Sequence, residues 1–311
     1  MDKPVRANVF MLCFMIYCAL LPFVFALVSL SGLVDAESES FESAIMLFQH
    51  ILLFLVPILI CCAVTKTRLG SIIPHEPLAL RDVLLSVLIA LFTLPLMLWV
   101  GFVTDFFVQD TSGIENEIAK YPMGFLIFSI GVMPGVFEEL MFRGVIMTGY
   151  KRTGLVRSVV FSALLFGIMH LNLYQLAYTA AAGIVFGIMV QYTNSIYSSM
   201  LAHFTINSVQ VVLSKLSDPD AAAAEEYTKM EMLASGSVML ACTLPVLIGL
   251  MYILIRCNRG RNIDYRYSLS ARREFVSDID AGRGRIIDFP FVLVIIIYVL
   301  YLKMMDSIGA M

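Results

Sequence analysis

The sequence carries little charge. Of its 311 residues, 14% are Asp, Glu, Lys or Arg, whereas 59% are apolar. Soluble globular proteins average about 25% charged and about 45–50% apolar residues. So much apolar surface could not all be buried in one or two soluble cores, which all but excludes a water-soluble fold. Disorder is excluded as well, because disordered segments need low hydrophobicity and much charge.

Signals for nucleic-acid and metal binding are also missing. The formal net charge is −3, and no basic strip is interleaved with aromatic residues, so no nucleic-acid partner is expected. The six cysteines lack metal-ligand spacing such as CxxC. We therefore expect them to be reduced and to act as small apolar fillers.

What the sequence does contain is long apolar runs. About 20 consecutive apolar residues cross a bilayer as a helix. The runs predict an all-α fold, a polytopic transmembrane bundle of eight to nine spans in a single integral-membrane domain, residues 1–311. The expected spans are 7–34, 44–64, 83–106, 123–148, 156–173, 175–192, 196–215, 236–256 and 289–304, of which the last is short.

The distribution of basic residues predicts the orientation. With the N-terminus in the cytoplasm, most Lys and Arg residues fall in the inner loops, among them Lys66, Arg68, Lys151 and Arg152, as the positive-inside rule requires. The longest inner segment, 257–288, is basic and is expected to be a solvated cytoplasmic loop near anionic lipid headgroups. We expect a multi-pass protein of the cell membrane.

One predicted span carries charges that an apolar helix does not need. Glu138, Glu139 and Arg143 lie within 123–148, and ionisable groups in a membrane are a functional hypothesis by default. Glu139 and Arg143 are four residues apart and can pair on one helix face. Glu138 is turned about 100° away. It is therefore an available carboxylate and a candidate general base, unless the cluster serves only to lock helix packing.

Polar residues on two other spans extend this candidate site. His170 ends the span 156–173, and His203 and Asn207 share one face of 196–215. A single histidine on an apolar helix is usually a packing residue. Together with an unpaired glutamate, however, two histidines and an asparagine can polarise a water and stabilise an oxyanion.

Other polar and small residues are expected to be structural. His50 stands alone in its span, where packing or an interhelical hydrogen bond would explain it. Gly131 and Gly135, and likewise Gly183 and Gly187, have GxxxG spacing, which favours close helix approach.

The motifs resemble those of a known family. The elements Glu138-Glu139-x-x-x-Arg143, Phe166-x-x-x-His170 and His203-x-x-x-Asn207 are similar, in order and spacing, to the three motifs of the CAAX protease and bacteriocin-processing family. These intramembrane endopeptidases include the type II CAAX prenyl endopeptidases. The resemblance covers about residues 120–210, which would be the motif-bearing catalytic core.

The resemblance implies an endopeptidase acting on a membrane-associated or lipidated peptide or protein. Glu138 would activate water and His170 would help to hold it. By the same similarity, His203 and Asn207 would stabilise the tetrahedral oxyanion. The partners implied are the lipid bilayer and the substrate.

The same resemblance leaves two mechanisms open. Glu139 and Arg143 would be supporting residues in either. Glu138, His170 and His203 could on paper bind zinc, since two histidines and a carboxylate form a known catalytic set. Because the two histidines lie on different helices and HExxH is absent, we favour a glutamate mechanism without a metal or other cofactor.

A mismatch of depth also arises from the predicted spans. In straight helices, Glu138 lies about sixteen residues below the outer start of its span, whereas His170 lies near the outer end of the next. Either the first of these spans begins later than 123, or it is broken at Pro134-Gly135. We favour the break, because membrane helices tolerate one where protein or water satisfies the backbone.

Two rival functions use the same residues. In a proton-coupled transporter, Glu138 and the histidines would form a proton relay. An inverted repeat would support transport, and none is detected. A catalytically silent membrane scaffold or immunity protein could share the fold, although the sequence has every motif residue.

Overall fold

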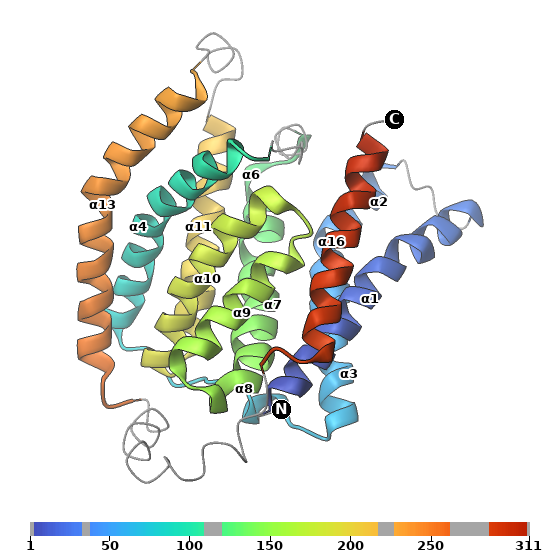
Figure 1. Ribbon diagram of the computed structural model, residues 1–311, viewed down its shortest axis with the longest axis horizontal. Helices are drawn as coiled ribbons and strands as arrows, with labels where there is room; N and C mark the ends of the chain where they lie inside the picture. Colours follow the sequence, from blue (N-terminus) through green and yellow to red (C-terminus); the bar gives the residue numbers. More distant parts are fainter. Residues whose placement is uncertain (1–2, 33–37, 109–119, 217–226, 262–285, 310–311) are drawn as a thin grey trace.

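The computed structural model describes residues 3–32, 38–108, 120–216, 227–261 and 286–309. These residues form nine continuous helices, which confirms the expected all-α class. Figure 1 shows the helices packed side by side, with the N-terminus at one end of the bundle and the C-terminus at the other.

The helices have the following bounds in chain order. They are α1 (Pro4–Leu30), α2 (Glu39–His50) continued by η1 (Ile51–Leu55) and α3 (Val56–Thr65), α4 (Leu80–Asp105), α6 (Met123–Leu126) continued by η3 (Ile127–Val132), α7 (Met133–Glu139), η4 (Leu140–Ile146) and α8 (Met147–Tyr150), then α9 (Leu155–Met169), α10 (Leu173–Thr193), α11 (Ile196–Leu216), α13 (Lys229–Asn258) and α16 (Phe289–Gly309). The segments η1, η3 and η4 are π-helical turns inside otherwise continuous helices.

Most of these helices can cross a bilayer. Six are long and apolar enough: Pro4–Leu30, Glu39–Thr65, Leu80–Asp105, Met123–Thr153, Leu173–Thr193 and Lys229–Asn258. Leu155–Met169 and Phe289–Met304 are apolar but shorter. The protein is therefore an integral, multi-pass membrane protein, and the prediction of eight to nine spans is confirmed only in part.

Helix α11 accounts for part of the difference. The sequence predicted a span at 196–215, and the helix is present with 21 residues, but it lies outside the set of six. Its buried face carries Ser198, Ser199 and His203, which lower its hydropathy. A helix enclosed by other helices does not need a fully apolar surface. Of the basic loop expected at 257–288, residues 262–285 lie outside the described part of the chain.

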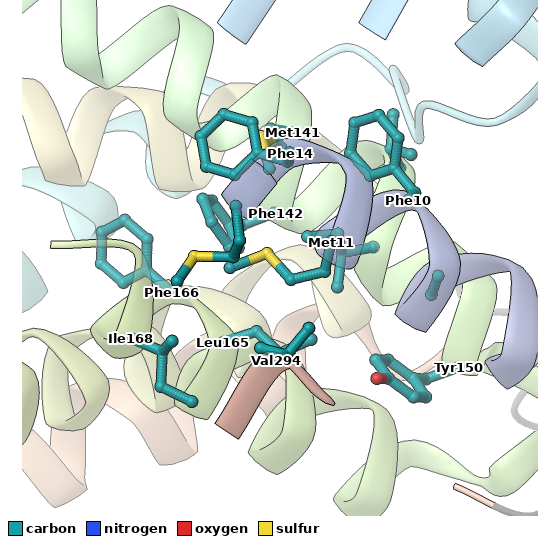
Figure 2. Close-up of a cluster of buried hydrophobic side chains, with 14 of the residues drawn as sticks. Phe10, Met11, Phe14, Met141, Phe142, Tyr150, Leu165, Phe166, Ile168 and Val294 are labelled. Atoms are coloured by element: carbon teal, nitrogen blue, oxygen red, sulfur yellow. The ribbon is translucent and has the colours of Figure 1, made fainter. Parts of the chain in front are cut away.

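The larger hydrophobic core joins the two ends of the chain to the middle. Phe10, Met11 and Phe14 of α1 pack with Phe142 of η4 and Val294 of α16, as Figure 2 shows. A buried polar contact reinforces this core: the Tyr150 hydroxyl donates to Asn8 Oδ1, while Asn8 Nδ2 donates to Asp288 Oδ1 at 2.8 Å. The helices α1, α8 and α16 are thereby tied together.

A second core lies between α4, α10, α11 and α13. It contains Ile89, Phe186, Met189, Ile206 and Leu254, among others. The polar candidate residues lie between the two cores, because the Phe166 ring belongs to the first and the Phe186 ring to the second.

The GxxxG pairs allow close packing, as expected. A Cβ atom on Gly135 would lie 3.2 Å from the backbone nitrogen of Phe204 in α11, and one on Gly131 would lie 2.7 Å from Ser208 Oγ. On α10, a Cβ on Gly187 would lie 3.0 Å from Val159 of α9. The glycines therefore set the spacing of α7 to α11 and of α10 to α9.

The cysteines fill less space than predicted. All six are free. Cys18, Cys61 and Cys62 are half-buried and pack against the larger core, as expected, whereas Cys13, Cys242 and Cys257 are exposed on the bundle surface. On helices of a membrane protein, an exposed thiol is a small apolar group facing the bilayer.

The helix that carries the two glutamates is not broken. It runs from Met123 to Thr153, and Pro134 occupies the first turn of α7 directly after the π-helical turn η3. The expected break at Pro134-Gly135 is therefore wrong. A π turn widens the helix locally and relieves the steric conflict that a proline creates.

The depth mismatch disappears because the helix that carries Glu138 continues past the predicted end at 148 to Thr153. Glu138 lies 15 residues before Thr153, and His170 lies 15 residues after Leu155. Measured from the turn that joins the two helices, both residues lie at about 22 Å. The span predicted at 156–173 ends at Met169 instead, where Leu171 adopts a positive φ of 54° and Asn172 caps α10.

Candidate active site

The candidate residues from three separate helices line one cavity. Its volume is about 580 Å³, and its walls include Glu138, His170, His203 and Asn207. Another ionisable side chain, His50 at the end of α2, lines the same cavity. The packing of α11 against α7 brings these groups together, and the glycines described above allow it.

The expected pairing of the second glutamate is present. Arg143 Nη1 donates to Glu139 Oε1 at 2.8 Å, and both side chains are buried, with 1% and 0% of their surface exposed. Glu138 lies one position earlier and points into the cavity. The helix therefore presents one neutralised carboxylate and one available carboxylate, as the spacing predicted.

Arg143 is enclosed by more than its carboxylate. Its Nη2 donates to the Gly183 carbonyl at 3.3 Å, and its guanidinium carbon lies 4.4 Å and 5.2 Å from the ring centroids of Phe166 and Phe186. A Cβ on Gly183 would lie 3.2 Å from Nη2, so the glycine makes room for the guanidinium. Cation–π contacts stabilise a desolvated guanidinium in such a place.

His203 lies between the two glutamates. Its Nδ1 lies 3.0 Å from Glu139 Oε1, and its Nε2 lies 4.0 Å from Glu138 Oε2. A carboxylate paired with Arg143 can only accept, so Nδ1 carries the hydrogen. Nε2 can act as a donor only when the ring is a doubly protonated imidazolium.

His170 has the opposite arrangement of donor and acceptor. It caps the C-terminal end of α9, and its Nδ1 lies 2.9 Å from the Phe166 carbonyl. Because a carbonyl only accepts, Nδ1 is the donor, and Nε2 of the neutral ring keeps a lone pair for the cavity. The four-residue spacing of the second motif thus has a physical reason: it fixes the tautomer of the histidine.

Asn207 is held by a carbonyl that a proline leaves free. Pro134 has no N–H to donate to the carbonyl of Ile130, one turn earlier. Asn207 Nδ2 donates to that carbonyl at 2.8 Å. An amide nitrogen has two hydrogens, so one remains for a group in the cavity.

His50 is the residue that sequence reasoning missed. Its Nε2 lies 3.7 Å from Glu138 Oε1, and it comes from a helix with none of the three motifs. The signal was its presence in an apolar run beside Gln49, which also lines the cavity. The sequence does not show how α2 packs against α7, so it could not show that His50 lies near Glu138.

The zinc alternative does not fit this arrangement. Among the residues that the structure describes, no group of three or more His, Cys, Asp or Glu side chains is placed to hold a metal ion. Glu138 and His203 approach each other, with His203 Nε2 at 4.0 Å from Glu138 Oε2, but the described side chains do not complete a set of three ligands.

Comparison with known proteins agrees with the motifs. Residues 121–209 match the family model described as "Type II CAAX prenyl endopeptidase Rce1-like". This segment of the chain is therefore similar to the Rce1-like family. The matched segment contains α6 to α10, the first two thirds of α11 and all three motifs, but neither α2 nor His50.

A curated relative shows a more distant similarity. The chain is 28% identical over 129 residues to a protein of Bacillus subtilis (strain 168) named "Putative membrane peptidase YdiL". The aligned part is 41% of this chain and 52% of YdiL, so the match spans about half of the relative's length. No solved structure matches the chain.

Proposed function

We propose that this protein is an intramembrane endopeptidase. It hydrolyses a peptide bond of a membrane-associated or lipidated substrate with a water molecule that Glu138 activates. The observation that carries the proposal is a buried carboxylate, not claimed by Arg143, in a cavity shared with two imidazoles and an amide. The match of residues 121–209 to the Rce1-like family model and the similarity to YdiL support the same reaction class.

Each side chain has a role that its hydrogen bonds permit. His170 Nε2 accepts a hydrogen bond from the water, and Glu138 takes the other proton as the oxygen attacks the scissile carbonyl carbon. The oxyanion that forms accepts hydrogen bonds from His203 Nε2–H and from the free N–H of Asn207. The C–N bond then breaks as the proton passes from Glu138 to the leaving amine. The remaining water proton leaves the new carboxylic acid for the free amine, so the products are a carboxylate and an ammonium group.

Glu139 and Arg143 support this chemistry without touching the substrate. Glu139 holds Nδ1 of His203, and Arg143 keeps Glu139 ionised and in place. Removing one preorganised oxyanion donor typically costs roughly 10²–10³ in rate. Loss of Glu138 should cost at least as much, because no other carboxylate of the cluster is available.

The substrate class follows from the family description and the location of the site. The matched family is named for prenyl endopeptidases, and a cavity among membrane helices suits a substrate held at the bilayer by a lipid or by apolar side chains. We propose one integral-membrane domain, residues 1–311, with its catalytic core at 120–210.

The orientation follows from the charge distribution. In Figure 1, α3 and α8 end on the same side of the bundle as the N-terminus. The basic residues Lys66 and Arg68 follow α3, and Lys151 and Arg152 follow α8. By the positive-inside rule we propose that this side faces the cytoplasm, in the cell membrane.

Cleavage by the full chain in proteoliposomes tests the proposal. One probe is an internally quenched peptide with a farnesylated cysteine four residues from its C-terminus, and a second is the same peptide without the lipid. A third is a mixture of synthetic membrane-inserted peptides, with new termini identified by mass spectrometry. Glu138→Gln is the test variant, and Glu39→Gln, at an exposed position on α2, is the matched control.

The outcomes are distinct. We expect cleavage by the wild type and by Glu39→Gln, with a loss of at least about 10²-fold in Glu138→Gln. Cleavage by Glu138→Gln at the wild-type rate would refute the role of Glu138. If no probe acquires new termini, the assignment as a peptidase fails.

A further inference from the structure

The carboxylate of Glu138 is flanked by two imidazoles on opposite oxygens. His50 Nε2 lies 3.7 Å from Oε1, and His203 Nε2 lies 4.0 Å from Oε2. Among the described residues, no side chain makes a direct hydrogen bond to this carboxylate. Contacts in catalytic sites are often long before substrate binds and tighten in the complex, and one water can bridge such a gap.

The function proposed above leaves one requirement unmet. A general base must hold its carboxylate in a fixed orientation toward the attacking water. Arg143 is committed to Glu139, and His203 Nε2 is needed for the oxyanion. Of the groups near Glu138, only His50 has no role in that scheme.

The environment of His50 favours a hydrogen on Nε2. Its Nδ1 is buried and has no hydrogen-bond partner among the residues described, while Nε2 faces a carboxylate. The ring stacks on Phe54 with centroids 5.9 Å apart and planes inclined by 21°, and 12% of the side chain is exposed. These contacts hold the ring in one orientation.

The backbone at His50 is irregular in the same way as at the glutamates. His50 is the last residue of α2, directly before the π-helical turn η1. Glu138 and Glu139 lie between the π turns η3 and η4. Such turns are rare and occur frequently at functional sites, where they re-aim side chains. All three of these turns adjoin residues around one carboxylate.

We propose that His50 is a positioning residue for Glu138, donating from Nε2 to Oε1, directly or through one water, so that Oε2 faces the attacking water. This inference rests on the proposed endopeptidase function. It also extends the catalytic machinery to α2, outside the segment that matches the Rce1-like family.

Two substitutions at one position separate this role from packing. His50→Gln keeps an N–H donor at nearly the same distance from the backbone, whereas His50→Leu keeps only bulk. We expect His50→Leu to lower kcat on the order of 10²-fold with KM little changed, because a misplaced base costs about that much. His50→Gln should retain kcat within about threefold. The control is His75→Gln, at an exposed histidine in a loop.

The farnesylated and lipid-free quenched peptides serve as probes, on the full chain in proteoliposomes. Each variant is first compared with the wild type by its thermal unfolding profile. Wild-type kcat in His50→Leu, or equal losses in His50→Leu and His50→Gln, would overturn the inference. So would a change confined to KM, because it would place His50 in substrate binding.

A double variant makes the dependence on Glu138 explicit. If His50 acts through Glu138, adding His50→Leu to Glu138→Gln causes no further loss of residual activity. Independent, multiplying losses would overturn the inference while leaving the endopeptidase intact. Conversely, wild-type activity in Glu138→Gln would refute the role of Glu138, and a wild type that cleaves no probe would refute the proposed function itself, so these failures are distinguishable.

Discussion

Replacing Arg143 by methionine should destabilise the bundle, and replacing its partner as well should restore most of the loss. Arg143 and Glu139 are both buried and 2.8 Å apart. Removing the guanidinium leaves an uncompensated carboxylate in an apolar interior, which typically costs about 3–5 kcal/mol. Methionine keeps apolar contact with the flanking rings of Phe166 and Phe186, so little is added for lost packing.

The double variant Glu139→Leu/Arg143→Met removes both charges. Apolar replacements for a buried ion pair are often neutral or stabilising. We expect the double variant to recover at least half of the stability that Arg143→Met loses. It should nevertheless be inactive, because His203 then lacks the acceptor for its Nδ1.

Unfolding can be followed by the fluorescence of the single tryptophan. Trp99 lies on α4 and donates from Nε1 to Ser237 Oγ of α13 at 3.0 Å, so its environment changes when the helices separate. The assay is a titration of the purified protein in mild detergent with a denaturing detergent. A double variant no more stable than Arg143→Met would refute the account, as would a stable Arg143→Met.

Two further results are expected. Gly135→Ala should lower kcat roughly tenfold, because the added Cβ meets the Phe204 backbone at 3.2 Å and moves Glu138 away from α11. The control is Gly249→Ala, where nothing lies within 4 Å of the added Cβ. Equal rates in the two variants would contradict the proposed role of the glycine spacing. Protein shown by metal analysis to be metal-free should cleave at the full rate in a chelator series, whereas a loss that zinc restores would contradict the glutamate mechanism.

Local features of the site were predictable because they depend on helical spacing. The pairing of Glu139 with Arg143 follows from a separation of four residues, and it is present at 2.8 Å. The close approach at Gly131 and Gly135 follows from GxxxG spacing. Assembly of the three motifs around one cavity followed from the family resemblance rather than from spacing.

Features that depend on long-range packing were not predictable. His50 is 88 positions before Glu138 in the numbering, and only the packing of α2 on α7 brings them together. The π turns leave no pattern in composition or periodicity. One of them, η3, lets the helix continue through Pro134-Gly135, where a break was expected.

The early end of α9 could have been predicted from one polar residue in an otherwise apolar run. The apolar run continues past residue 170, which suggested a span to 173. Asn172, however, accepts from the backbone nitrogens of Tyr174 and Gln175, and an asparagine before an apolar-periodic segment is a helix-start signal. Hydropathy averaged over a window cannot detect one such residue.

The short α9 also bears on how hydrolysis can occur among lipids. The chain leaves helical geometry at Leu171, about 22 Å from the turn at the other end of α9. A hydrocarbon layer is about 30 Å thick, so the peptide groups after α9 lie within it. Such groups tolerate protein or trapped solvent as neighbours, but not acyl chains. A helix that stops about three-quarters of the way across therefore requires protein or water beside its end, at the depth of Glu138. If the proposed endopeptidase function holds, the same break in the helix would let water reach the carboxylate.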